Sequence, residues 1–188
     1  GVELVGFDSE KSYRETAGIF SRAGHRSIAL NDILFPSGEP LPGNHKLHSI
    51  FQEAGMTVYG LHPGPGVAPG DVPRRMAENL AALYWKEGVK AAFIRNDLLA
   101  AEVMHRLGDY GIHVPGDVAL IGFSGSPYSG WLPVPLTTFE HPVEEMCQCT
   151  MNLLDGKESS GSPRSHIFEN KLVLRKSHGP TNGLKKGE

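Results

Sequence analysis

One order of segments recurs four times along this chain: an amphipathic helix, a glycine, a short apolar stretch, and a polar loop rich in Gly and Pro. The apolar stretches lie at 27–30, 56–61, 91–94 and 118–123. Helices and strands that alternate at this spacing build parallel sheets through right-handed crossovers, which place helices on both faces. The sequence therefore predicts an α/β fold with a doubly wound, mainly parallel sheet.

The helices are predicted from apolar residues that recur at helical spacing. The stripes are Tyr13, Ala17 and Phe20 in the first helix, Leu47, Ile50, Phe51 and Ala54 in the second, Met76, Leu80, Leu83 and Tyr84 in the third, and Leu99, Val103 and Leu107 in the fourth. Each helix is expected to stop at a glycine. Asp71 is expected to cap the third helix, with Pro73 in its first turn.

The loops that follow the four strands share one edge of the predicted sheet. Ligands of open α/β sheets bind outside the carboxyl ends of the strands. Those ends lead into the loops 31–43, 62–72, 95–97 and 124–135. This edge is the candidate binding site.

The composition limits the function classes that the chain can have. With 188 residues, 39% of them hydrophobic and 21% charged, it is expected to be soluble, with one sizeable core or two small lobes. It contains no apolar run long enough to span a membrane, and its start lacks the features of a secretory signal. A formal charge of −3 argues against a nucleic-acid-binding surface in these residues. Cys147 and Cys149 stand two residues apart, which suits neither a disulfide nor a shared metal and is consistent with a reducing cytoplasm.

The repeated pattern of helix and strand ends after the fourth strand. Residues 12–135 are predicted to form one α/β lobe, and residues 136–177 to contain a further helix and strand that need not belong to it. Residues 1–11 precede the first helix. Residues 178–188 are polar and Gly-rich, so a flexible tail is expected there.

Several motifs occur together in one order: NDLLA at 96–100, VPGDVALIGFSG at 114–125, PLTT at 135–138 and LVLRKS at 172–177. Near the start, VGFDS is followed by a helix and then by AGHRSIAL. In this order the motifs resemble the lactose-repressor/galactose-repressor family of bacterial transcription regulators, over roughly residues 4–177.

The resemblance implies a periplasmic-binding-protein-like sensor of type I, with two α/β lobes joined by crossing strands and a small effector in the cleft. Residues 1–11 would be a segment between the lobes, 12–135 the C-terminal lobe, and 136–177 the return towards a second, N-terminal lobe that is incomplete in these 188 residues. The family's helix-turn-helix and most of its first lobe have no counterpart in these 188 residues, so operator DNA would be bound by a part of the protein outside them. The family also implies a cytoplasmic homodimer, and we expect self-association through the third helix's face with Met76, Leu80 and Tyr84 or through its neighbours.

Asn96 and Asp97 follow an apolar strand directly, and two interpretations are open. Asn96 is a suitable N-cap, and a carboxylate at the next position is favoured by the helix dipole and the free N–H groups. The family resemblance implies instead that Asp97 accepts hydrogen bonds from the effector. We favour ligand binding for Asp97 and capping for Asn96, and both can hold.

The chain departs from the family pattern at two places. The family's effector-gripping arginine would fall at Gly43 or Asn44, and loop 31–43 contains neither Arg nor Lys. The family's Gly-Phe-Asp-Asp ends here as Gly-Phe-Ser124-Gly125. Without the loop arginine, a carboxylate or phosphate on the effector lacks its obvious partner, so a neutral sugar or a related compound is expected. Arg95 is the residue that could overturn this expectation.

The predicted effector site combines polar groups with an aromatic lining, as small-molecule sites do. Its members are Asn31, Asp32, His62, Arg95, Asn96, Asp97, Phe123, Ser124 and Trp131. No catalytic residue, metal ligand or cofactor is predicted.

Three other sequence patterns are not interpreted as metal, catalytic or phosphate-binding sites. His45 and His48 stand three apart on a helix, but no cysteine is near and a surface position explains them. GFSGS at 122–126 does not fit a nucleophile corner, and no general base is implied by spacing. The segment 61–71 lacks the Lys-Ser/Thr ending of a phosphate loop, and its prolines remove N–H donors.

The leading hypothesis is the effector-sensing domain of a bacterial transcription regulator. The alternative is an exported sugar-binding receptor of a transporter, against which the PLTT and LVLRKS motifs stand. An enzyme on a doubly wound sheet is a third class, because fold does not dictate function. No constellation in the sequence predicts turnover.

Overall fold

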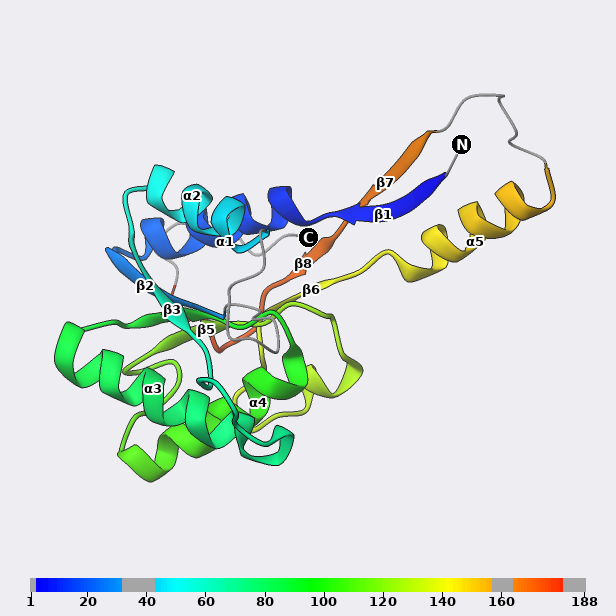
Figure 1. The fold of residues 1–188 in the computed structure, drawn as a ribbon. Helices are drawn as coiled ribbons and strands as arrows, with labels where there is room; N and C mark the ends of the chain where they lie inside the picture. The colour runs from blue at the N-terminus through cyan, green and yellow to red at the C-terminus, as the bar shows by residue number, and fades with distance from the viewer. Residues whose placement is uncertain (1–2, 32–42, 157–163, 181–188) are drawn as a thin grey trace.

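The structure is a computed structural model that describes residues 3–31, 43–156 and 164–180. Figure 1 shows a lobe of sheet and helices, from which strands β1 and β7 and helix α5 extend as an arm. The lobe contains β2 (Ser27–Asn31), β3 (Thr57–Leu61), β4 (Ala91–Phe93), β5 (Ala119–Ile121), α1 (Ser9–Arg22), α2 (Gly43–Glu53), α3 (Val72–Glu87), α4 (Asp97–Leu107) and the short helices η1 (Pro69–Asp71), η2 (Gly108–Tyr110) and η3 (Pro127–Gly130). The arm and the crossing segments contain β1 (Leu4–Asp8), β6 (Thr138–Glu140), α5 (Val143–Leu154), β7 (Ser165–Glu169) and β8 (Lys171–Val173).

The main sheet confirms the predicted α/β architecture. Its order is β3-β2-β4-β5, and all of its pairings are parallel. Helices α1 and α2 pack together over one face, while α3 and α4 pack together over the other (Figure 1). Each of the four observed strands lies within its predicted stretch or extends one residue past it. Because the strands are parallel, their carboxyl ends meet at one edge of the sheet.

Two apolar layers hold the lobe together because strand residues alternate between the faces. Ile28 and Leu30 of β2 pack with Phe20 of α1 on one face. Ala29, between them, packs with Met76 and other α3 and α4 residues on the opposite face. The predicted stripes of the helices therefore face the sheet.

This packing shows that the expected dimer surface on the third helix is wrong. Met76 and Leu80 are fully buried inside the lobe. Tyr84 packs against the same core, and its hydroxyl donates to Asp117 Oδ1 at 3.4 Å. The stripe is occupied by the chain's own core and is not available to a second copy.

The helix caps follow the sequence at α4 but not at α3. Asn96 Oδ1 accepts a hydrogen bond from Leu99 N at 2.9 Å, which confirms the predicted cap of α4. Asp71 stands at the N-cap of α3 but makes no capping hydrogen bond with its side chain. Its carboxylate accepts from the Arg74 guanidinium instead, because η1 runs into α3 and leaves Asp71 in helical backbone geometry.

Three segments cross between the lobe and the arm. Strands β6 and β8 pair antiparallel, and Thr137 bridges to Ile121 of β5 in parallel, so the crossing pair continues the edge of the main sheet. Strands β1 and β7 pair in parallel farther out, beside α5 (Figure 1). The assignment of this arm to an incomplete second lobe stays a prediction.

The segment after β8 returns to the lobe and is clasped there. Ser177 Oγ donates to Leu120 O at 2.6 Å and accepts from Thr137 N at 2.9 Å. His178 Nδ1 lies 2.6 Å from Thr137 Oγ1, and burial lowers the pKa of this imidazole. The first residue of the predicted tail is thus buried, while residues 181–188 lie outside the described part.

No helix in the described part of the chain is both long and apolar enough to cross a membrane.

Candidate functional site

The carboxyl edge of the main sheet brings together residues that are far apart in the sequence. Asn31 pairs with Leu61 in register, which places His62 beside the end of β2. Phe93 pairs with Ile121, which brings the Arg95–Asp97 corner next to the loop that begins at Gly122. Asp32, the remaining predicted residue of the β2 loop, lies outside the described residues.

Asp97 is fully buried, and both of its carboxylate oxygens are engaged within the protein. Oδ1 accepts from Thr138 Oγ1 at 2.7 Å, and Oδ2 accepts from Ser126 N at 2.9 Å. Its backbone N–H donates to Ser124 Oγ at 3.1 Å. The carboxylate therefore joins the start of α4 to the β5 loop and to β6, and its predicted contact with an effector stays a prediction.

Two glycines let the chain close around this carboxylate. A Cβ built at Gly122 would lie 2.3 Å from Asp97 Oδ1, so only glycine fits against it. Gly125 has a φ of 62°, and a Cβ added at this position would lie 2.5 Å from Glu140 Cα. The second departure from the family's Gly-Phe-Asp-Asp pattern has a steric reason here: the backbone of Glu140 occupies the space that an acidic side chain at 125 would need.

Arg95 places a guanidinium near the start of α2, where loop 31–43 has no arginine of its own. Nη2 donates to Asn44 Oδ1 at 2.8 Å, and Nε donates to the main-chain oxygen of Asn31 at 3.2 Å. Asn44 is buried near the start of α2, at a position where the family resemblance placed an arginine. Within the described residues no carboxylate lies within ion-pair distance of Arg95. Its charge is held by neutral oxygens, and N–H donors remain for another partner.

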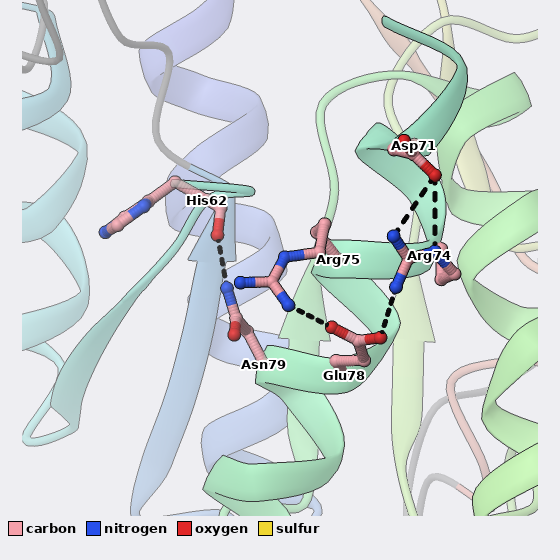
Figure 2. A network of polar contacts seen from close by, with 6 residues as sticks. All are labelled: His62, Asp71, Arg74, Arg75, Glu78 and Asn79. Atoms are coloured by element: carbon pink, nitrogen blue, oxygen red, sulfur yellow. Dashed lines mark hydrogen bonds and ion pairs between the residues drawn. The ribbon is translucent and has the colours of Figure 1, made fainter. Parts of the chain in front are cut away.

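His62 carries an unsatisfied polar atom at the same edge. Its Nδ1 is buried and has no hydrogen-bonding partner among the described residues. Its main-chain oxygen accepts from Asn79 Nδ2 at 2.7 Å, while Figure 2 shows the ring directed away from α3. Buried polar atoms are nearly always hydrogen-bonded, so this nitrogen is suited to a water molecule or a ligand hydroxyl.

A network of surface ion pairs near His62 joins η1 to the first turns of α3 (Figure 2). Arg74 Nη1 donates to Glu78 Oε1 at 2.7 Å and Nη2 to Asp71 Oδ1 at 3.2 Å. Arg75 Nη1 donates to Glu78 Oε2 at 2.6 Å. Each of these ion pairs adds little stability, and the contact between α3 and His62 is made by Asn79.

The aromatic members of the predicted site have different environments. Phe123 is buried, and its ring lies within 4.9–6.1 Å of the rings of Phe7, Tyr13, Phe93, Phe139 and His141. Trp131 follows η3 and is 84% exposed. Phe123 thus belongs to the core beneath the edge, whereas no described contact joins Trp131 to the other predicted site residues.

Ser124 lines a groove of about 630 Å³ where the crossing segments leave the lobe. The other walls of this groove are mostly polar and acidic, and include Glu140, His141, Glu144, Glu145, Glu169 and Lys171. In the described residues, no group of three His, Cys, Asp or Glu side chains is arranged to hold a metal ion.

Sequence reasoning missed three residues that complete the network at this edge: Asn44, Ser126 and Thr138. Thr138 belongs to the PLTT motif, which was used only to recognise the family. A hydroxyl on a strand and an amide near a helix start carry no sequence signal for partners about 40 or 50 residues away. Only the meeting of strand ends reveals them.

Comparisons with known proteins agree with this fold. A model of the family described as periplasmic binding protein-like domain matches residues 17–178. Among curated proteins, the chain is similar to an HTH-type transcriptional regulator of Mycolicibacterium smegmatis, with 26% identity over 203 residues, 96% of this chain and 54% of that protein. It is also similar to the ribose operon repressor of Bacillus subtilis, with 39% identity over 82 residues, 43% of this chain and 24% of that protein.

Solved structures give the same picture. A LacI family transcriptional regulator from Arthrobacter sp., in complex with lactose, has a TM-score of 0.76 at 23% identity, covering 92% of this chain and 65% of that one. The transcriptional regulator CelR, in complex with cellobiose, has a TM-score of 0.70 at 25% identity, covering 94% of this chain and 54% of that one. The chain spans about half the length of the first curated relatives it matches.

Proposed function

Because this chain belongs to the periplasmic binding protein-like domain family, we propose that it is the effector-sensing part of a LacI-type transcriptional regulator. The effector is a small neutral sugar or a related compound, bound at the carboxyl edge of the β3-β2-β4-β5 sheet. Effector binding modulates operator recognition by a helix-turn-helix of the full-length protein. The protein works in the cytoplasm as a homodimer and has no catalytic role.

One observation carries the proposal: unsatisfied hydrogen-bonding groups meet at the edge where open α/β sheets bind ligands. The buried Nδ1 of His62 has no described partner, and Arg95 has donors to spare beside Asn31 and Asn44. Hydroxyl groups of a sugar both donate and accept, so they match this mixed set. The lactose and cellobiose in the complexes of the similar regulators are neutral sugars, which supports the same ligand class here.

Asp97 has a positioning role in this proposal. Its oxygens hold Thr138 and the Ser126 amide, and its own amide holds Ser124. A sugar hydroxyl that competes for either oxygen would loosen the join between α4 and the crossing strand β6. Ligand binding and the position of the crossing segments are thereby linked through one carboxylate.

The regulatory step is a shift of population between two arrangements of the lobes. An effector that binds one arrangement better than the other favours that arrangement by the difference in binding free energy. A coupling of about 1–3 kcal/mol, typical of allosteric proteins, changes operator affinity by roughly 5- to 150-fold.

The curated relatives argue against the exported receptor. They are HTH-type transcriptional regulators and a ribose operon repressor, which are DNA-associated proteins. We therefore propose regulation of transcription in preference to transport.

Arg95 provides the sharpest test of the ligand class. Calorimetry should measure binding of a panel of neutral mono- and disaccharides, each paired with its phosphorylated form. We expect a neutral sugar to bind, and Arg95→Gln to weaken it about tenfold or more, because hydrogen bonds from charged groups contribute about 1.5–3 kcal/mol.

The matched control is Arg26→Gln, since Arg26 is exposed and precedes β2 at the opposite edge of the sheet. It should leave binding unchanged. Tight binding of sugar phosphates alone, lost in Arg95→Gln, would contradict the neutral ligand and make Arg95 the partner of an anionic group. If Arg95→Gln and Arg26→Gln behave alike towards a bound sugar, the sugar does not occupy this edge.

A further inference from the structure

The segment after β3 carries His62, one of the two groups with spare hydrogen-bonding capacity at the proposed effector site. Strand β3 ends at Leu61, which pairs with Asn31 of β2. Beyond this strand, no described main-chain hydrogen bond ties residues 62–67 to another described part of the lobe. The position of His62 therefore depends on contacts made by side chains.

Asn79 of α3 supplies such a contact. Its Nδ2 donates to the main-chain oxygen of His62 at 2.7 Å, in a partly buried hydrogen bond between residues 17 positions apart. Figure 2 shows Asn79 reaching the main chain of His62 from α3, while the imidazole points away from this helix. The amide thus holds His62 by its backbone and does not occupy a nitrogen of the ring.

Helix α3 gives the Asn79 side chain a fixed starting point, because the helix is packed into the core on both sides of it. The buried residues of α3 nearest to Asn79 in the sequence are Met76, Ala77, Leu80 and Ala81. A ligand-binding group is held accurately when packing and hydrogen bonds fix the residues that support it. Asn79 provides this support for His62, from an element that cannot shift without disturbing the core.

The residue before Asn79 has a different role. Glu78 accepts hydrogen bonds from the guanidinium groups of Arg74 and Arg75, and all three belong to α3 (Figure 2). Among the described residues, Glu78 makes no contact with His62. The two neighbours on one helix therefore differ in what they hold: Glu78 holds side chains of α3, and Asn79 holds the segment that carries His62.

We propose that Asn79 is a positioning residue of the effector site, which holds the main chain of His62 so that the buried Nδ1 of the ring meets a hydroxyl group of the sugar. The inference rests on the proposed function and extends its site to a residue of α3. Without this alignment the hydrogen bond to the sugar is lost, and the buried nitrogen stays without a partner. The affinity for the sugar thus depends on a residue that does not touch it.

Calorimetry of the full-length protein with the panel of neutral mono- and disaccharides, lactose and cellobiose included, tests this role. Asn79→Asp keeps the size of the side chain but replaces the donor N–H group by an acceptor, which repels the main-chain oxygen of His62. We expect it to weaken the sugar that binds best by about fivefold or more, the loss of one hydrogen bond. Asn79→Ser, which is too short to reach His62, should have the same effect without adding a charge. Glu78→Gln is the matched control and should leave the affinity unchanged.

A double-mutant cycle with His62→Ala separates positioning from a general effect on the fold. His62→Ala should weaken the same sugar at least as much as Asn79→Asp does. Adding Asn79→Asp to His62→Ala should cause no further loss, because the ring that Asn79 positions is gone. Nitrogen NMR gives a second measurement: the ring resonances of His62, assigned by their loss in His62→Ala, should shift when the sugar is added. That shift should persist in Glu78→Gln and shrink in Asn79→Asp.

Equal affinity of the parent protein and of both Asn79 variants for a bound sugar would overturn the positioning role and leave the proposed function in place. Losses that add in the double variant would also overturn it, since Asn79 would then affect binding by a route other than His62. If the parent protein binds no member of the panel, the proposed effector class fails, and the positioning role fails with it.

Discussion

The lobe and the arm are built from the same kinds of elements but bury their apolar residues very differently. In the lobe, β2 and β4 lie between helices on both faces, and their apolar side chains are inaccessible. In the arm, β1 and β7 form a two-stranded sheet with α5 beside them, and Leu4, Ile167, Val143, Met151 and Leu154 are exposed.

This difference shows that amphipathic patterns report a side chain's preference for burial and not its actual burial. Helix α5 has apolar residues at helical spacing as α1 does, yet Cys149 is its only buried residue in the described chain, whereas α1 buries five. A helix hides its stripe only where another layer covers it. The stability of the described chain therefore resides in the lobe.

Truncation of large side chains in the two regions gives the largest expected contrast. Phe93→Ala removes a fully buried ring from the centre of the lobe and should lower the free energy of unfolding by about 3–5 kcal/mol. Leu154→Ala in the arm should change it by no more than about 0.5 kcal/mol, because little burial is lost. Urea unfolding monitored by circular dichroism measures both. Similar losses for the two variants would show that the arm folds as part of the same core.

The junction between the regions gives the next effect. Asp97→Ala leaves the Ser126 amide and the Thr138 hydroxyl without their acceptor, and should lower the free energy of unfolding by about 2–4 kcal/mol. Amide hydrogen exchange should accelerate in β6 more than in β2, since β6 loses its attachment to α4. Asp109→Ala, at an exposed carboxylate of η2, is the control and should have little effect. Unchanged exchange in β6 would mean that Asp97 does not hold the crossing strand.

The smallest effect concerns pH and the clasp at His178. Burial lowers the pKa of His178, so the unfolded chain binds a proton at a higher pH than the folded chain does. Stability should therefore fall as the pH drops below about 6.5, and by no more than about 1.4 kcal/mol between pH 6.5 and 5.5, the equivalent of one proton over one unit.

Urea midpoints at pH 7.5 and 5.5 test this, with His178→Gln as the variant. The variant should show a smaller loss between the two pH values, although His25, whose pKa is lowered by burial and by Lys90, retains its own share. An equal loss in the variant and the parent chain would assign the pH dependence to other groups.

The predicted fold followed from local pattern and needed little else. The strands at 27–30 and 91–94 and the cap at Asn96 were predicted because short apolar stretches, helical spacing and capping residues are each encoded within a few residues. The predicted capping role of Asp71 was wrong because the short helix η1 precedes α3 and leaves Asp71 in helical backbone geometry. The stripe with Met76 was recognised as apolar, but sequence alone did not distinguish a core from an interface.

The candidate site was predicted in its place and only partly in its contacts. The carboxyl edge follows from the order of helices and strands. That Asp97 binds Thr138, and that Arg95 reaches Asn44, are pairings across about 40 and 50 residues. Such pairings depend on which strands are neighbours in the sheet, and the order β3-β2-β4-β5 is decided by packing of the whole lobe.

The amino-acid sequence by itself determined the α/β class, the positions of the elements, the family resemblance and the edge at which a ligand would bind, because these depend on short-range periodicity and on motifs in order. The tertiary structure alone decided which polar groups are satisfied, as at Asp97, and which are left with capacity, as at Arg95 and His62. It also decided that Asn79 of α3 reaches the main chain of His62. The physical reason is that burial and hydrogen-bond satisfaction are properties of a residue's neighbours in space, which distant parts of the chain provide.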